Sequence, residues 1–152
     1  MEDYKIGQYN FSTDIITGEK GEEDVINFYS KKGYKLIATC NDKKFDLLLQ
    51  GLNRSPLKIE VKTDSYKDTG NMAIEVESRG SASGLMVTEA EYFVTLFRFN
   101  NELWIIKTDD LKELITSNNF YLKTGGDQGS NTKFYLINKA KFKKHFQVHQ
   151  LT

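Results

Sequence analysis

Three charged residues stand at spacings that could support hydrolysis of a phosphodiester. Asp46 lies in the apolar run 45–49, and Glu60 and Lys62 lie in the alternating run 57–62. A carboxylate in a buried strand needs a partner, a proton or a cation. Two adjacent carboxylates favour a divalent cation, and Mg²⁺ binds one or two carboxylates together with water and phosphate oxygens. Bound Mg²⁺ polarises a phosphoryl oxygen, and Lys62 would orient the nucleophile or stabilise negative charge, so the trio predicts metal-assisted hydrolysis.

A predicted β-hairpin would position this trio. Residues 50–56 have the composition of a turn, and they separate the runs 45–49 and 57–62. In an antiparallel pair closed by that turn, Asp46 lies near the far end of the second strand, beside Glu60 and Lys62. The two-residue period of the second strand places Lys58, Glu60 and Lys62 on one face and the apolar residues on the other.

The remaining pattern predicts one α/β domain with a central mixed sheet flanked by helices. Residues 1–18 are expected to be an irregular arm, 18–99 a catalytic core, and 100–152 a C-terminal extension with a basic tail. A helix is predicted over 21–32 because its apolar residues recur at helical spacing, and Gly33 follows it. Further strands are predicted at 34–39, 72–77, 93–99, 103–106, 120–122 and 133–137; helices are predicted from Thr88, after Asp109 or Asp110, and across the final basic stretch.

Composition excludes several classes of protein. The chain has 152 residues, 21 Lys and Arg against 21 Asp and Glu, one cysteine and two histidines. Cys40 alone cannot form an internal disulfide, and with His145 and His149 it cannot supply a four-ligand zinc site, so any metal must be held by oxygens. The N-terminus lacks an apolar secretion signal, and no run is long enough to cross a membrane, which favours an intracellular, cytoplasmic protein.

Positive charge is concentrated near the C-terminus, where residues 121–152 hold six lysines and one aspartate. Such a segment either binds a nucleic-acid backbone or is a solvated surface. Arg79, in a Gly/Ser-rich loop, could also bind a phosphate, or that loop could be a flexible connection. The candidate nucleic-acid contacts are therefore Arg79, Lys123, Lys133, Lys141 and Lys144.

The order of these features resembles the PD-(D/E)XK nuclease superfamily, which includes restriction endonucleases and archaeal-type Holliday junction resolvases. The resemblance covers about residues 18–99: a helix with an early Glu22, then Gly33-Tyr34, a strand, the run 44–48 around Asp46, and the run 59–62. Phe45 replaces the proline of the nominal motif. The segment from Thr69 to Ala90 is also similar to small phage-encoded nucleases.

The resemblance implies a restriction endonuclease-like fold and Mg²⁺-dependent cleavage of DNA, with Mn²⁺ as a substitute metal. It assigns the metal to Asp46, Glu60 and Val61, and it assigns catalytic roles to Asp46, Glu60, Lys62 and Glu22. Helix geometry independently selects Glu22, because it shares a face with Val25 and Ile26 whereas Glu23 does not. A structure-specific or junction-resolving enzyme, a homing-type enzyme and a restriction-like enzyme are all open, with branched or junction DNA as one candidate substrate. A homodimer is expected because one active site cuts one strand. A phage-encoded enzyme would act in the host cytoplasm.

Two other interpretations of the same residues are open. A catalytically silent relative would use this surface to hold nucleic acid or a partner protein. A small structural domain would carry Glu60 and Lys62 only as surface ion pairs, because Lys and Glu often alternate on half-exposed strands.

Overall fold

The computed structural model describes residues 13–40, 44–126 and 128–151, and within them the strands form two sheets. The larger sheet has six strands in the order β1 (Tyr34–Thr39), β2 (Leu47–Gly51), β3 (Leu57–Asp64), β6 (Tyr92–Phe97), β7 (Glu102–Lys107) and β10 (Gln147–Gln150). Its pairs are antiparallel except for β3 and β6, which are parallel. The predicted mixed sheet is therefore confirmed.

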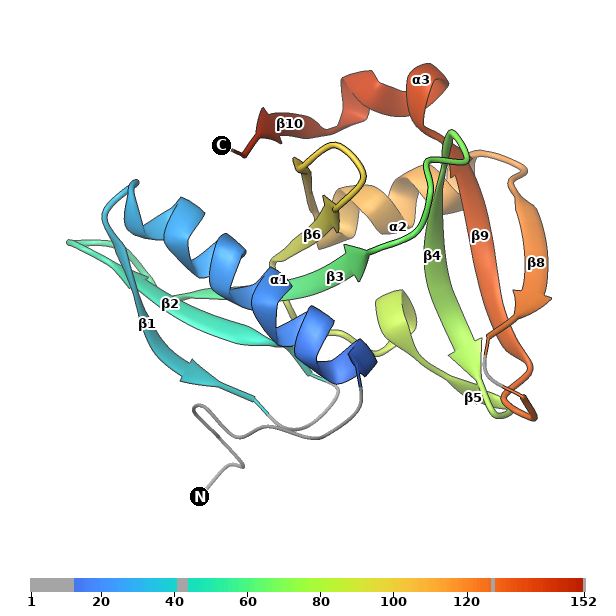
Figure 1. Cartoon of the computed structure of the whole chain (residues 1–152), viewed down its shortest axis with the longest axis horizontal. Coiled ribbons are helices and arrows are strands. Elements are labelled where there is room, and N and C mark those ends of the chain that lie inside the picture. The colour runs from blue at the N-terminus through green and yellow to red at the C-terminus, as the bar shows by residue number, and fades with distance from the viewer. Residues whose placement is uncertain (1–12, 41–43, 127, 152) are drawn as a thin grey trace.

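A second, four-stranded antiparallel sheet lies beside the first and was not predicted. Its strands are ordered β5 (Ser81–Ala82), β4 (Asn71–Ser78), β9 (Thr132–Asn138) and β8 (Tyr121–Gly125). The short helical turn η1 (Gly84–Met86) follows β5 and packs against β4. Figure 1 shows this sheet on the right of the molecule, next to the end of β3.

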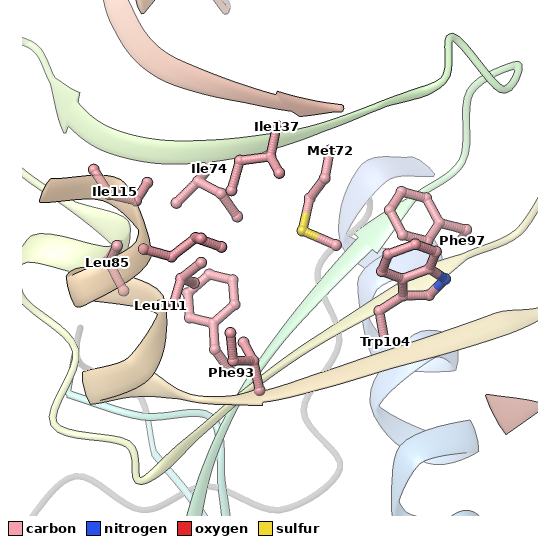
Figure 2. Close-up of a cluster of buried hydrophobic side chains, with 11 residues drawn as sticks. Met72, Ile74, Leu85, Phe93, Phe97, Trp104, Leu111, Ile115 and Ile137 are labelled. Atoms are coloured by element: carbon pink, nitrogen blue, oxygen red, sulfur yellow. The ribbon is translucent and has the colours of Figure 1, made fainter. Parts of the chain in front are cut away.

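Two apolar clusters, one on each face of the large sheet, hold the layers together. Successive residues of β6 alternate between them: Phe93 belongs to one cluster and Val94 to the other. Helix α1 (Thr13–Ser30) crosses one face (Figure 1) and buries Val25 and Tyr29 there. Helix α2 (Thr108–Ser117) and the four-stranded sheet enclose the other cluster, shown in Figure 2. Burial of these apolar side chains is the main stabilising contribution.

The start of α1 differs from the predicted arm. The helix begins at Thr13, so residues 13–18 are helical, while residues 1–12 lie outside the described part. Thr17-Gly18 suggested a break, and a glycine weakens a helix by up to about 1 kcal/mol. Gly21 has a packing role that offsets this, because an added methyl group there would overlap the hydroxyl of Thr63 on β3. Close contact between helix and sheet thus overrides local propensity.

The helix predicted from Thr88 is wrong. Residues 88–91 have no helical conformation, and the hydroxyl of Thr88 is used in contacts with other parts of the chain. At the C-terminus, only Lys139–Phe142 (α3) and Lys143–His145 (η2) are helical, and β10 then completes the large sheet. The C-terminal strands thus contribute to both sheets: β7 and β10 to the larger one, and β8 and β9 to the smaller one.

The other predicted elements are confirmed with small shifts at their ends. β2 and β3 form the expected antiparallel hairpin, with Leu47 opposite Ile59. β6 and β7 form the second hairpin, and α2 follows with Asp109 and Asp110 in its first turn. In the described residues, no helix has the length and apolar character needed to span a membrane.

Candidate active site

The β2–β3 hairpin brings the predicted trio together. Asp46 lies just before β2, and its main-chain amide donates to the Ile59 carbonyl over 3.0 Å. Its side-chain Oδ2 accepts a 2.7 Å hydrogen bond from the main-chain amide of Val61. Glu60 Oε2 lies 3.3 Å from Lys62 Nζ. The convergence expected from the turn and the strand period is confirmed.

Both carboxyl groups of the trio lie where negative charge is disfavoured. The Glu60 side chain is 9% exposed, so its pair with Lys62 is not a surface ion pair. Burial, together with the charge of Asp46, raises the pKa of Glu60 to about 7. Burial also raises the pKa of Asp46 to about 6, despite the hydrogen bond from Val61. Desolvation of the charged form is the physical cause common to both shifts.

Lys62 lies among more than one carboxylate. Burial alone would lower its pKa, but Glu60, Asp46 and Glu75 together outweigh burial and raise it. Glu75 comes from β4 of the second sheet, so this sheet forms part of the electrostatic environment of the site. The Lys62 side chain remains 40% exposed, so the site is not closed off from solvent.

Helix α1 adds a fourth carboxylate. Glu22 is half-buried and close enough to Asp46 for its charge to raise the pKa of Asp46, whereas Glu23 is exposed. The predicted orientation of the two glutamates is confirmed, because Val25 packs in the core on the face that Glu22 shares.

The donor set at this site suits Mg²⁺. Asp46 and Glu60 present hard oxygen ligands from neighbouring strands, and Glu22 and Glu75 add negative charge around a single lysine. A divalent cation would stabilise the ionised forms of both carboxyl groups, which burial disfavours. The Val61 side chain has no ligand atom, so only its main-chain oxygen could bind a metal. In the described residues no group of three or more His, Cys, Asp or Glu side chains could hold a metal ion, so water and substrate would supply the other ligands.

The predicted nucleic-acid contacts lie on the second sheet and on the C-terminal segment. Arg79 and Lys123 are exposed, on the β4–β5 turn and on β8, and Lys133 pairs with Glu77 at 3.2 Å. Lys141 and Lys144 are exposed on α3 and η2.

Other basic or metal-ligating candidates near the C-terminus have different surroundings. Lys139 is buried against Phe97 and Trp104 and is inaccessible to phosphate. His145 lies in η2 and His149 on β10, so the two histidines do not share the helix that a metal-binding pair would need.

Sequence reasoning missed two residues of the site, Glu75 and Thr88. The strand period assigns Glu75 to the polar face of its strand, and no local signal shows that this strand lies beside Lys62. The spacing of residues 88–91 predicts Thr88 as the first residue of a capping box, yet its hydroxyl lies 3.0 Å from Glu60 Oε1. The local sequence pattern around Thr88 therefore does not predict its contact with Glu60.

Comparison with known proteins identifies the fold. No family model matches the chain, and no curated protein matches it. Its structure is similar to that of the bacterial homing endonuclease I-Ssp6803I, with a TM-score of 0.51 and 15% sequence identity, over 83% of this chain and 79% of that chain. The chain shares its fold with a nuclease. The mixed α/β architecture expected for a nuclease fold is thereby confirmed, and the large mixed sheet with its flanking helices belongs to that fold.

Proposed function

We propose that the protein is a Mg²⁺-dependent endodeoxyribonuclease of the PD-(D/E)XK type. The convergence of Asp46, Glu60 and Lys62 on one hairpin carries the proposal, because two buried carboxylates with raised pKa values lie beside a single accessible lysine. Such a cluster of perturbed groups is typical of a catalytic site, since it costs free energy that a folded domain does not otherwise need. The shared fold with a homing endonuclease supports the proposal.

The carboxylates and the lysine of the trio have different roles. Asp46 and Glu60 would hold the metal, and Val61 fixes Asp46 through its amide hydrogen bond. When bound, Mg²⁺ would neutralise charge on the scissile phosphate and activate water. Lys62 orients the attacking water and stabilises the negative charge that develops on the phosphoryl oxygens. Glu22, on α1, acts on Asp46 through its charge and would orient water at the metal site.

DNA is the proposed substrate, and exposed cations are the proposed contacts with its backbone. Arg79, Lys123, Lys141 and Lys144 are exposed, whereas Lys133 would first have to leave Glu77. Replacing a cation that binds a phosphate flattens the salt dependence of DNA binding by roughly one unit for each cation replaced, so an unchanged slope would exclude these residues. Cleavage of both strands would require a homodimer, because the described residues of one chain form one such site.

A cleavage panel tests the proposal. The full chain is incubated with linear duplex, single-stranded, branched and junction DNA, and with RNA, in Mg²⁺, in Mn²⁺ or in EDTA. We expect cleavage of DNA in either metal and none in EDTA. Cleavage confined to a branched form would select a junction-specific enzyme. Binding without cleavage in every metal would contradict the proposal and favour a silent nucleic-acid-binding module, and absence of both binding and cleavage would contradict either function.

A further inference from the structure

Residues 83–90, which we call the strap, connect the second sheet to the candidate active site. At one end, the amide of Ser83 donates to the Val76 carbonyl of β4 over 3.0 Å. Leu85 is fully buried in the apolar cluster of Figure 2. At the other end, the amide of Glu89 donates to the Lys44 carbonyl over 2.6 Å, two residues before Asp46. The strap is thus hydrogen-bonded to β4 near one end and to the segment just before Asp46 near the other.

Close packing fixes the path of the strap. Gly84 has a φ of 53°, a left-handed conformation that favours glycine. An added methyl group at Gly84 would overlap the main-chain carbonyl of Glu75, so the strap runs directly against β4 there. The side chain of this same residue, Glu75, raises the pKa of Lys62. The amide of Thr88 then donates to the Gly84 carbonyl over 3.1 Å, which sets the position of Thr88 relative to this turn.

The hydroxyl of Thr88 lies within hydrogen-bond distance of three groups. Its Oγ1 is 3.0 Å from Glu60 Oε1, 3.0 Å from the Lys44 carbonyl and 3.2 Å from the amide of Ala90. The Ala90 amide can only donate, so it occupies a lone pair of the hydroxyl. The Lys44 carbonyl and the Glu60 carboxylate are both acceptors for the single hydroxyl hydrogen. An ionised carboxylate is the stronger acceptor, so it is favoured over the carbonyl.

This geometry restrains both oxygens of Glu60. Thr88 contacts Oε1 from the strap, and Lys62 contacts Oε2 from the same strand. Two different partners on the two oxygens fix the rotation of the carboxylate, and Thr88 is only 6% exposed, so water cannot readily replace it. Polar groups that orient a metal ligand in this way typically contribute a factor of about 10–100 to metal affinity.

We propose that Thr88 is a positioning residue that holds the Glu60 carboxylate in its metal-binding orientation. The inference rests on the proposed function, because it takes Glu60 as a metal ligand. The strap is hydrogen-bonded to β4 of the second sheet, and the Thr88 hydroxyl connects it to Glu60 of the large sheet.

Mg²⁺ affinity, measured by calorimetry on the full chain without DNA, tests this role. Thr88→Val removes the hydroxyl and keeps the shape of the side chain, and we expect it to weaken Mg²⁺ binding at least about tenfold. Thr88→Ser keeps the hydroxyl and should bind within about threefold of wild type. The matched control is Thr108→Val: Thr108 is also buried, but its hydroxyl has no hydrogen-bond partner among the described residues, so Mg²⁺ affinity should not change.

Two results would overturn the inference. The first is Thr88→Val that binds Mg²⁺ as tightly as wild type, and the second is Thr88→Ser that binds as weakly as Thr88→Val. Should the valine variant fail to fold, Thr88→Ala is measured in its place. A wild-type chain that binds no Mg²⁺ would contradict the proposed function instead. In that case a crystal structure of Thr88→Val decides the inference: a displaced Glu60 carboxylate supports positioning by Thr88, and an unmoved one refutes it.

Discussion

Lys62 and Lys139 each lie beside a carboxylate, but their surroundings differ. Lys139 Nζ is 3.8 Å from the ring centre of Phe97, 5.5 Å from that of Trp104 and 3.4 Å from Asp68 Oδ1, and its side chain is 9% exposed. Lys62 contacts the Glu60 carboxylate at 3.3 Å and is 40% exposed. The Lys139 ammonium is enclosed by two aromatic rings and one carboxylate. The Lys62 side chain is partly exposed and lies near several carboxylates.

The difference indicates that the two lysines have different roles. The Lys139 main-chain amide also donates to the Gly70 carbonyl over 2.9 Å, so this residue fastens the segment between β3 and β4 to the aromatic cluster. The aromatic faces and Asp68 stabilise the Lys139 ammonium, and the charge of Asp68 balances that of Lys139. The carboxylates around Lys62, in contrast, exceed the single positive charge present. We interpret the first set as structural and the second as prepared for a cation and a phosphate.

Replacing each lysine by methionine gives the sharpest test of this comparison, because methionine keeps the apolar stem and removes the charge. We expect Lys62→Met to lower the rate of DNA cleavage in Mg²⁺ by about 10²–10³, since a donor to the developing charge is removed. Circular dichroism should show a folded variant. A Lys62→Met enzyme that cleaves at the wild-type rate would place Lys62 in the structural class with Lys139.

Burial of the Asp46 and Glu60 carboxyl groups predicts an unusual pH dependence of stability in the metal-free protein. The pKa of Asp46 is raised from 3.8 to about 6 and that of Glu60 from 4.5 to about 7, so the folded state binds protons more tightly than the unfolded state. Their contribution to the free energy of unfolding is present below about pH 4 and is lost as pH rises through 6–7.

Urea unfolding at about pH 5 and pH 7.5 measures this effect. Relative to the double variant Asp46→Asn/Glu60→Gln, the wild type should lose roughly 1–3 kcal/mol between the two pH values, at about 1.4 kcal/mol for each pKa unit. Mg²⁺ should restore stability mainly at the higher pH, because metal binding requires the ionised ligands. Parallel pH profiles for wild type and double variant would contradict the raised pKa values of Asp46 and Glu60.

Glu22 and Glu23 test whether α1 belongs to the region of Lys62. Glu22→Gln should lower the cleavage rate at least about tenfold with little change in DNA affinity, because the Glu22 carboxylate is proposed to orient water at the metal site. Glu23→Gln, on the exposed side of the same helix, should leave both quantities unchanged. Equal, small effects of the two substitutions would exclude Glu22 from the catalytic machinery.

Lys139→Met completes the comparison and has the smallest expected effect. Removal of the ammonium over Phe97 should lower the free energy of unfolding by roughly 1–2 kcal/mol, the value of a desolvated cation–π interaction. Cleavage at a temperature where the variant is folded should remain close to wild type. A large drop in cleavage rate at unchanged stability would contradict the structural role of Lys139.

The part of the site that could be predicted from the sequence is the part encoded locally. A turn-forming segment between an apolar and an alternating strand determines the β2–β3 hairpin, and its register then places Asp46 beside Glu60. The contact between Thr88 and Glu60 joins residues 28 positions apart, and it depends on how the strap crosses β3. No local pattern encodes that crossing.

The fold shows the same division between local and tertiary determinants. The alternating run of β4 predicts a strand, but its pairing with β9 joins Met72 to Ile137, and strand periodicity does not select a partner so distant in sequence. The helix α1 extends past two glycines, and at Gly21 its contact with Thr63 leaves no room for a larger residue. Short C-terminal elements such as β10 depend on an available sheet edge, here that of β7.

The rate of DNA cleavage in Mg²⁺ by Asp46→Asn tests the central claim most directly. The substitution keeps the size of the side chain and an oxygen that can accept the Val61 hydrogen bond, but a neutral amide is a poor ligand for Mg²⁺. Asp109→Asn, at an exposed position of α2, is the control and should cleave like wild type. We predict that Asp46→Asn folds normally and shows no Mg²⁺-dependent cleavage above background. Cleavage by Asp46→Asn at the wild-type rate would contradict the assignment of this site as the metal-dependent nuclease centre.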